Sequence, residues 1–279
     1  MPQEAGAKPP VLIVASTVDP ASKNIADFLI RHHGFWKTGS LEGGTLLRSR
    51  DPSSNIRLLI TGSELVSFDP SSVLDDVGLF IFVSRHESQS RLSSLTVHAP
   101  GNIAEAEHGG VAWKVSVAAP GPMKDALRRL SLDNVRLRLN HLVSYEATHH
   151  GPSLDKPALF IEIGSSQAAW SNPKAGEAAA NAVMDAAVSQ DNYTPALGVG
   201  GPHYNPKFTE AGLEGRLALG HIIPKHALLA LTPDLLEQCL RRTMGGVHVA
   251  LVDWKGTPGP ARRWIVAELE QRGVEVRRV

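Results

Sequence analysis

The sequence predicts an α/β fold, a single compact domain with a central mixed, mostly parallel sheet. Short continuous apolar runs, such as PVLIVAS at 10–16 and GLFIFVS at 78–84, are typical of strands buried on both faces. Segments with helical periodicity alternate with such runs along the chain. No repeat, low-complexity segment or obvious linker divides the 279 residues. We therefore expect a flexible N-terminus at 1–9 and one domain at 10–279.

The first elements are a strand at 10–16 and a helix after it. Asp19 caps free backbone amides and Pro20 fits the first turn, so the helix is expected to begin there and to end at Gly34. Further strands are expected at 45–50, 56–62, 77–85, 93–102, 142–151, 157–165, 195–201, 248–254 and, at a sheet edge, 274–279. Helices are expected at 123–142, 175–189 and 259–271, and around Cys239. The stretch 38–55, with a turn at Asp51, is expected to be the longest flexible region after 1–9.

Composition excludes several classes of protein. Lys and Arg number 28, as do Asp and Glu, so a strongly basic nucleic-acid binder is not the first interpretation. Cys239 is the only cysteine, which leaves no disulfide framework and no thiolate zinc site, and a metal would need histidine and carboxylate ligands. The apolar runs are too short to span a bilayer, and the first ten residues do not resemble a secretory signal. We expect a cytoplasmic protein without a membrane partner.

Histidines follow several of the predicted strands. His86, His98, the pair His149–His150, and His203 each come soon after an apolar run. Ligands of open α/β sheets bind outside the carboxyl ends of the strands, so these side chains are expected to converge in one cleft. The alternative is that each histidine is a solvated loop residue with local hydrogen bonds.

Two glutamates accompany these histidines. Glu162 lies inside the apolar strand at 157–165, and Glu146 lies just before the histidine pair, so the two carboxylates meet if their strands are neighbours. A glutamate buried in an apolar strand has to be paired, hydrogen-bonded or bound to a metal. The alternative is that Glu162 occupies an exposed position on a half-buried strand and has no functional role. A mixture of histidine and glutamate suits zinc, and it equally suits acid–base chemistry without a metal.

Seven blocks in order resemble the D-aminoacyl-tRNA deacylases of archaea and plants. They are STVDPASKNI (16–25), FVSRHESQS (82–90), LTVHAPGN (95–102), EATHHGPS (146–153), FIEIGSSQAAW (160–170), GVGGPHYNPKFTE (198–210) and GHIIPKHAL (220–228). The sequence departs from the family pattern at Pro202 and Lys207, which concerns how the substrate is held. The resemblance implies hydrolysis of the ester between a D-amino acid and tRNA, Zn²⁺ at two ions per subunit, and a fold similar to phosphorylases and peptidyl-tRNA hydrolases.

For the hydrolysis that this resemblance implies, a role can be expected for each candidate residue. Under a metal mechanism the ligands would be His98, Glu146, His149 and His150, with Glu162 orienting them or acting as base. Without a metal, His149 or His150 would be the base and backbone amides near Gly164 or Gly200 would stabilise the oxyanion. A third possibility is assistance by the 2′-hydroxyl of the terminal ribose. The catalytic residues are thus His149, His150 and Glu162, and the substrate-binding residues are Arg85, His86, His203, Lys207, His221 and Lys225.

The expected partner is the acceptor end of D-aminoacyl-tRNA, bound by a monomer that needs no other protein. Arg85, Lys207 and Lys225 are expected to meet phosphates there, with ordinary surface ion pairing as the alternative for each. The rival functions are a zinc-dependent peptidase or amidase with the same cleft, and a non-catalytic tRNA-binding module whose histidines are structural.

Overall fold

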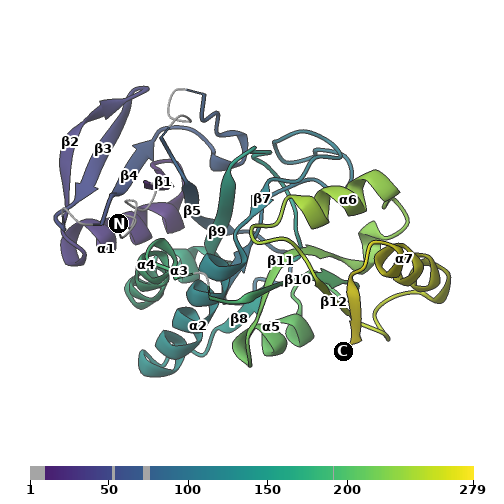
Figure 1. Ribbon diagram of the computed structural model, residues 1–279. Coiled ribbons are helices and arrows are strands. Elements are labelled where there is room, and N and C mark those ends of the chain that lie inside the picture. The colour runs from purple at the N-terminus through teal and green to yellow at the C-terminus, as the bar shows by residue number, and fades with distance from the viewer. Residues whose placement is uncertain (1–9, 52–53, 72–75, 191) are drawn as a thin grey trace, which may run out of the picture.

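Two sheets organise the chain in the computed structural model, which describes residues 10–51, 54–71, 76–190 and 192–279 (Figure 1). The segment 1–9, predicted to be flexible, lies outside the described residues. The hairpin of β2 and β3 forms one end of the molecule, and α7 with the C-terminus forms the other (Figure 1).

The larger sheet has nine strands and mixed pairing. Its spatial order is β2 (Phe35–Leu41), β3 (Gly44–Ser49), β4 (Ile56–Thr61), β1 (Val11–Ser16), β5 (Leu79–His86), β9 (Pro157–Gly164), β6 (Ser94–His98) and β8 (Leu142–Tyr145), and the short β7 (Val117–Ala118) also pairs with β9. The β2–β3, β3–β4 and β6–β9 pairs are antiparallel and the other pairs are parallel. The predicted mixed, mostly parallel central sheet is therefore confirmed.

The smaller sheet has four strands, all parallel. Its order is β11 (Leu217–Ile223), β10 (Thr194–Val199), β12 (Val249–Val252) and β13 (Glu275–Arg278). One cluster of buried apolar side chains includes Ile13 and Ile161 of the larger sheet and Ala196 and Leu219 of the smaller one. Because this core runs through both sheets, they belong to a single α/β domain.

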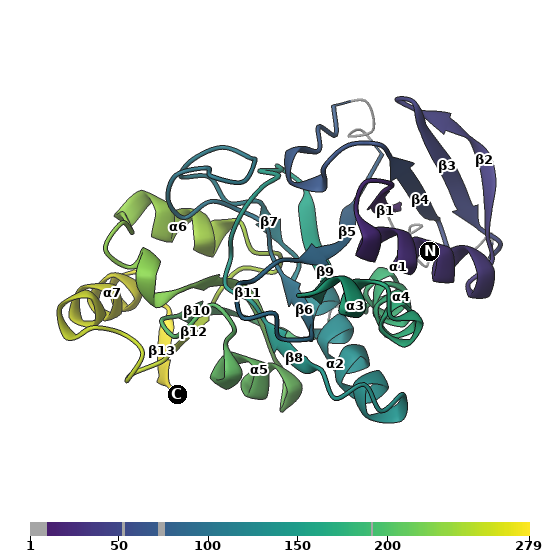
Figure 2. The same ribbon diagram turned by 180° about the vertical axis from the view of Figure 1, so that it is seen from behind.

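Helices α1 (Pro20–His32), α2 (Pro120–Arg136) and α4 (Pro173–Ala187) lie beside one another on one face of the larger sheet (Figure 2). The opposite face packs against Leu65, which lies in the short 3₁₀ helix Leu65–Ser67, and against Phe68 and Leu154. Near the smaller sheet lie α5 (Pro206–Leu213), α6 (Pro233–Arg241) and α7 (Gly259–Gln271), and α3 (Gln167–Trp170) is one short turn before α4. Among the described helices, none has both the length and the apolar character needed to cross a membrane.

The structure corrects several predicted elements. The stretch 38–55, expected to be flexible, contains most of the β2–β3 hairpin: Glu42 and Gly43 both have positive φ in a two-residue turn, and Phe35 and Leu47 are buried. The strand expected at 142–151 ends at Tyr145, so the histidine pair follows it in an irregular segment. The helix expected at 123–142 spans 120–136: prolines fit its first turn, and it ends before Arg138 and Asn140, which both have positive φ. The sequence interpretation missed β2, β7, β11, α3 and α5.

Candidate active site

The segment 146–150 lies at the junction of the two sheets. Its backbone amides donate to the Val97 carbonyl in β6 at 3.1 Å, to the His203 carbonyl after β10 at 2.9 Å, and to the Ile222 carbonyl in β11 at 2.9 Å. Three separate elements therefore fix the backbone that carries Glu146 and the histidine pair.

Gly151 explains why glycine follows the histidine pair. A β-carbon added at Gly151 would lie 2.3 Å from both the Gly110 nitrogen and the Val66 oxygen, which is closer than any real side chain allows. Just before it, the His150 carbonyl accepts a 2.7 Å hydrogen bond from the Gly101 amide. The close backbone approach at Gly151 thus fixes where the two imidazole rings emerge.

Glu162 lies in the middle of three neighbouring strands. It is in register with Ser84 of β5 on one side and with Thr96 of β6 on the other. Its Oε1 accepts a 2.6 Å hydrogen bond from the Ser84 hydroxyl, and its Oε2 lies 3.3 Å from His86 Nδ1 and 3.6 Å from His98 Nε2. His150 Nε2 is 3.9 Å from Oε1. Only 2% of the Glu162 surface is exposed, so it has the buried partners that its apolar strand requires.

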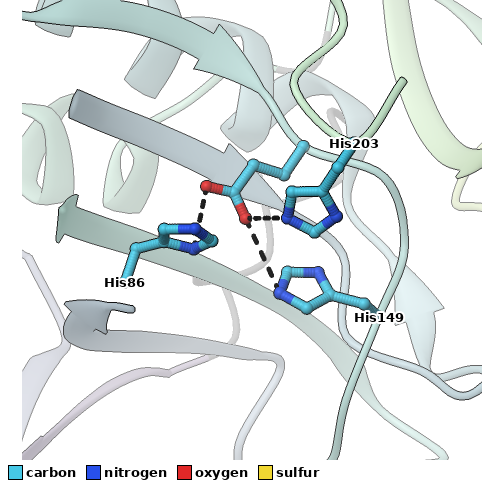
Figure 3. A group of neighbouring side chains, drawn as sticks. His86, His149 and His203 are labelled. Atoms are coloured by element: carbon cyan, nitrogen blue, oxygen red, sulfur yellow. Dashed lines mark hydrogen bonds and ion pairs between the residues drawn. The ribbon is translucent and has the colours of Figure 1, made fainter. Parts of the chain in front are cut away.

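Glu146 organises a second set of histidines, shown in Figure 3. Its Oε1 lies 3.1 Å from His86 Nδ1, and its Oε2 lies 3.1 Å from His203 Nε2 and 3.6 Å from His149 Nε2. His86 stands between the two glutamates and contacts both. The carboxylates do not meet through adjacent strands, because β6 lies between β8 and β9.

The charges of these groups follow from their contacts. Burial by itself would raise the pKa of both glutamates, but the neighbouring imidazoles of His203 and His86 hold the pKa of Glu146 well below its usual value, and those of His150, His86 and His98 do the same for Glu162. Burial would lower the pKa of His86, yet the two carboxylates raise it to about 11. Burial lowers the pKa of His149 well below its usual value. His86 is therefore an imidazolium and His149 is neutral at pH 7.

Two overlapping groups have donor atoms close enough together to hold a metal ion. One is His98, His149, His150 and Glu162; the other is His86, Glu146, His149 and His203. The structure thus places Glu162, and not the predicted Glu146, with His98 and His150. In each group the donor atoms lie within 4.8 Å of one another.

The first group fits a metal better. The Nδ1 atoms of His98, His149 and His150 donate to backbone carbonyls at 3.3, 2.9 and 2.7 Å, so in the neutral rings Nε2 is left as the free acceptor nitrogen. The buried Nε2 of His98 makes no hydrogen bond with any described residue. In the second group His86 is an imidazolium, so its positive charge already neutralises a carboxylate. Neither of its ring nitrogens has a free lone pair for a metal. Since His149 has one free nitrogen, it can complete only one group.

A cavity of about 880 Å³ opens above these groups. Its lining includes His86, His149, His150, Glu162 and His203, together with Arg85, Tyr204 and Asp19. Arg85 is 28% exposed, lies 3.9 Å from Glu64 and 3.7 Å from Glu87, and has no shorter polar contact through its side chain among the described residues. The cavity therefore combines a His/Glu floor with a loosely paired cation at its wall.

Three predicted substrate-binding residues do not line this cavity. His221 is fully buried, where its Nε2 donates to the carbonyls of Ser116 and Arg242. Lys207 is held by Asp253 at 2.7 Å and by the Val279 carbonyl at 2.9 Å. Lys225 is exposed and lines a neighbouring cavity.

The sequence interpretation gave no role to two polar residues of the site. Ser84 contacts Glu162, and Asp19 accepts hydrogen bonds from the backbone amides of Ser22 and Arg85 at 2.9 and 2.8 Å. The sequence predicts Asp19 as a helix cap, which the structure confirms, but does not indicate that it lines the cavity. The position of Ser84 at a strand end was visible, but its partner depends on the register of β5 and β9, which the sequence does not give.

A family model, several relatives and a solved structure match this chain. The family described as D-aminoacyl-tRNA deacylase matches residues 74–277. A D-aminoacyl-tRNA deacylase of Thermococcus kodakarensis is 37% identical over 273 residues, and one of Pyrococcus furiosus is 36% identical over 274; each alignment covers 95% of this chain and 98% of the relative. A crystal structure described as a conserved protein of unknown function is 29% identical and superposes with a TM-score of 0.88, over 97% of this chain and 95% of the other.

The family match covers β5, the segment 146–150 and β9, and with them both His/Glu groups. The predicted likeness to phosphorylases and peptidyl-tRNA hydrolases stays a prediction. The family that was expected from the seven sequence blocks is confirmed, and the chain belongs to the D-aminoacyl-tRNA deacylase family.

Proposed function

We propose that this chain hydrolyses the ester bond of D-aminoacyl-tRNA in the cavity above the two His/Glu groups, and so releases a free D-amino acid and tRNA. Family membership supports the reaction. The observation that carries the location is the convergence of five histidines and two ionised glutamates next to one cavity, whose lining includes His86, His149, His150, His203 and Glu162. The predicted rivals, a zinc-dependent peptidase or amidase and a non-catalytic tRNA-binding module, have no observation in their favour.

An ester is already activated, so the site has to position a water molecule and stabilise the negative charge that develops on the carbonyl oxygen. His149, His150 and Glu162 are the proposed catalytic residues. The neutral His149 is available to accept a proton or to bind a metal, and the imidazolium of His86 places a fixed positive charge at the floor of the cavity. Ser84 and the carbonyls bonded to Nδ1 of the histidines hold these groups in place before substrate arrives.

The group that would hold a zinc ion is His98, His149, His150 and Glu162. Three imidazoles and one carboxylate are ligands that zinc prefers. A bound zinc ion lowers the pKa of a coordinated water molecule towards about 7 and polarises a carbonyl oxygen. Because His149 can complete only one group, we expect one well-formed zinc site per subunit, whereas the resemblance implies two ions.

Substrate contacts are proposed for the residues that the structure leaves accessible. Arg85 and His203 line the cavity, and Arg85 is positioned to meet a phosphate of the acceptor end. Lys225 lies outside the catalytic cavity but remains free for such a contact. Lys207 and His221 are engaged within the protein, so we assign them to its stability. We further propose that the protein acts in the cytoplasm as a monomer.

The test is release of D-Tyr and L-Tyr from tRNA by protein purified without chelator, with its zinc content measured by mass spectrometry. We expect D-Tyr to be released far faster than L-Tyr, and about one zinc ion per chain. After removal of the metal, D-Tyr release should fall, and added zinc should restore it. Equal rates for the two esters, or no release of D-Tyr, would contradict the proposed function. A full rate in the metal-free protein would contradict the zinc assignment alone.

A further inference from the structure

A second cavity, of about 800 Å³, lies at one edge of the smaller sheet. All strands of this sheet are parallel, so the carboxyl ends of β10, β11 and β12 meet there. The lining comes from the loops after these strands: Gly201 and Pro202 follow β10, Lys225 and His226 follow β11, and Gly256 follows β12. Ligands of parallel α/β sheets bind at this edge, so the position is that of a binding site.

This second cavity adjoins the catalytic cavity. Pro202 lines both, and the next residue, His203, belongs to the catalytic cavity. A 2.9 Å hydrogen bond from the Lys225 amide to the Gly201 carbonyl joins the two loops at this boundary. His226 lies close enough to His203 for the charge of His203 to add to the effect of burial in lowering the pKa of His226. An extended ligand, such as a polynucleotide, that occupies the catalytic cavity can therefore continue past Pro202 into the second cavity.

The lining of the second cavity suits a nucleotide. It contains no carboxylate, and Lys225 is exposed and forms no ion pair with any residue that the structure describes. Apolar surface comes from Pro202, Pro258 and Leu229, and Leu229 is 94% exposed. Proteins recognise single-stranded RNA by packing unstacked bases against flat or apolar side chains and by pairing phosphates with cations.

A third cavity, of about 560 Å³, also borders Pro202 and Tyr204, but its charge argues against RNA. Its lining includes Glu210 and Glu214 and no lysine or arginine. An RNA backbone carries one negative charge per nucleotide, so these carboxylates would repel it. Of the two cavities next to the catalytic one, only the cavity at Lys225 matches a polyanion in charge.

We propose that the cavity at Lys225 binds the cytidine nucleotides that precede the terminal adenosine of tRNA, with a base against Leu229 and Pro258 and a phosphate at Lys225. The proposal rests on the proposed function, because it requires the terminal aminoacyl-adenosine to occupy the catalytic cavity. The conserved CCA end of tRNA is thereby held on both sides of Pro202, and the ester is positioned by contacts remote from the bond that breaks.

The test compares Leu229→Asp and Lys225→Glu with the wild-type protein in direct titrations with a CCA trinucleotide and with adenosine alone. Both changes place a negative charge in the cavity, so affinity for the trinucleotide should fall about tenfold or more while affinity for adenosine changes little. In deacylation, both variants should raise the KM for D-Tyr-tRNA, and Lys225→Glu should reduce the salt slope of tRNA binding by about one.

Matched controls carry the same changes elsewhere on the surface. Lys37 is exposed on the edge strand β2, and Leu132 is 64% exposed on α2. The variants Lys37→Glu and Leu132→Asp should therefore leave the affinities for the trinucleotide and for adenosine unchanged. Equal losses for trinucleotide and adenosine, or losses no greater than in the controls, would overturn the proposal. Failure of the proposed function shows separately, as a wild-type protein that releases no D-Tyr.

Discussion

At the scale of single residues, the contact that best explains the geometry of the site is the hydrogen bond from Ser84 to Glu162. At 2.6 Å, it holds one carboxylate oxygen and turns the other towards His86 and His98. Residues that orient a ligand or a catalytic carboxylate in this way typically affect activity or metal affinity by about 10- to 100-fold. Ser84 is therefore a positioning residue of the site.

We predict that Ser84→Ala lowers kcat for D-Tyr-tRNA and weakens zinc binding, each by about 10-fold or more, with little change in KM. Thr96→Val is the matched control, since Thr96 is in register with Glu162 on the opposite strand and its buried hydroxyl has no hydrogen-bond partner among the described residues. Steady-state kinetics and a zinc titration measure both effects. A wild-type kcat in Ser84→Ala, or an equal loss in Thr96→Val, would show that this bond does not position Glu162.

The site residues that could be predicted from the sequence are those whose residue type and position on a strand each indicate a function without knowledge of their partners. Histidines after apolar strands and a glutamate within one were enough to predict that His98, His149, His150 and Glu162 come together, and the structure does bring them together. Their grouping was not predictable, because it depends on β6 lying between β8 and β9 and on which nitrogen of each ring is free. The roles assigned to them stay predictions.

At the scale of elements, α2 shows what helical periodicity leaves open. The periodicity predicts an amphipathic helix there but not that Lys124 is fully buried within it. Its Nζ donates to the carbonyls of Glu214, Gly215 and Leu217 at 3.2, 3.0 and 2.8 Å. The ammonium group thus links α2 to the start of β11. The sequence of α2 cannot predict this contact, because the carbonyls belong to residues about 90 positions further along the chain.

We predict that Lys124→Met lowers the free energy of unfolding by about 3 kcal/mol, because three buried carbonyls lose a charged donor. Lys174→Met is the matched control: Lys174 donates to the Leu137 carbonyl at 3.2 Å on the surface, and its loss should cost about 0.5 kcal/mol or less. Urea unfolding of both variants measures the difference. Equal stabilities for the two variants would mean that the buried ammonium contributes no more than a surface contact.

At the scale of the whole molecule, the sequence predicted the single α/β domain and its mixed sheet but not the division into two sheets. The second sheet depends on β11, whose strand at 217–223 went unrecognised, and on long-range pairing that strand patterns do not encode. That division matters for function, because the segment 146–150 is fixed from both sheets at their junction. The catalytic cavity and the cavity at Lys225 lie on the two sides of the loop after β10, which supplies Pro202 and His203.

The most direct test of the central claim is single-turnover deacylation of D-Tyr-tRNA by His149→Ala, His150→Ala and Glu162→Gln, with thermal unfolding of each variant. We expect each change to slow the chemical step by about 100-fold or more, since general-base and metal contributions have this size, while the midpoint of unfolding moves little. The double variant His149→Ala with Glu162→Gln should be little slower than the worse single variant, because residues that act as a unit are not additive. Wild-type rates in both histidine variants would contradict the account and would leave the pair a structural role only.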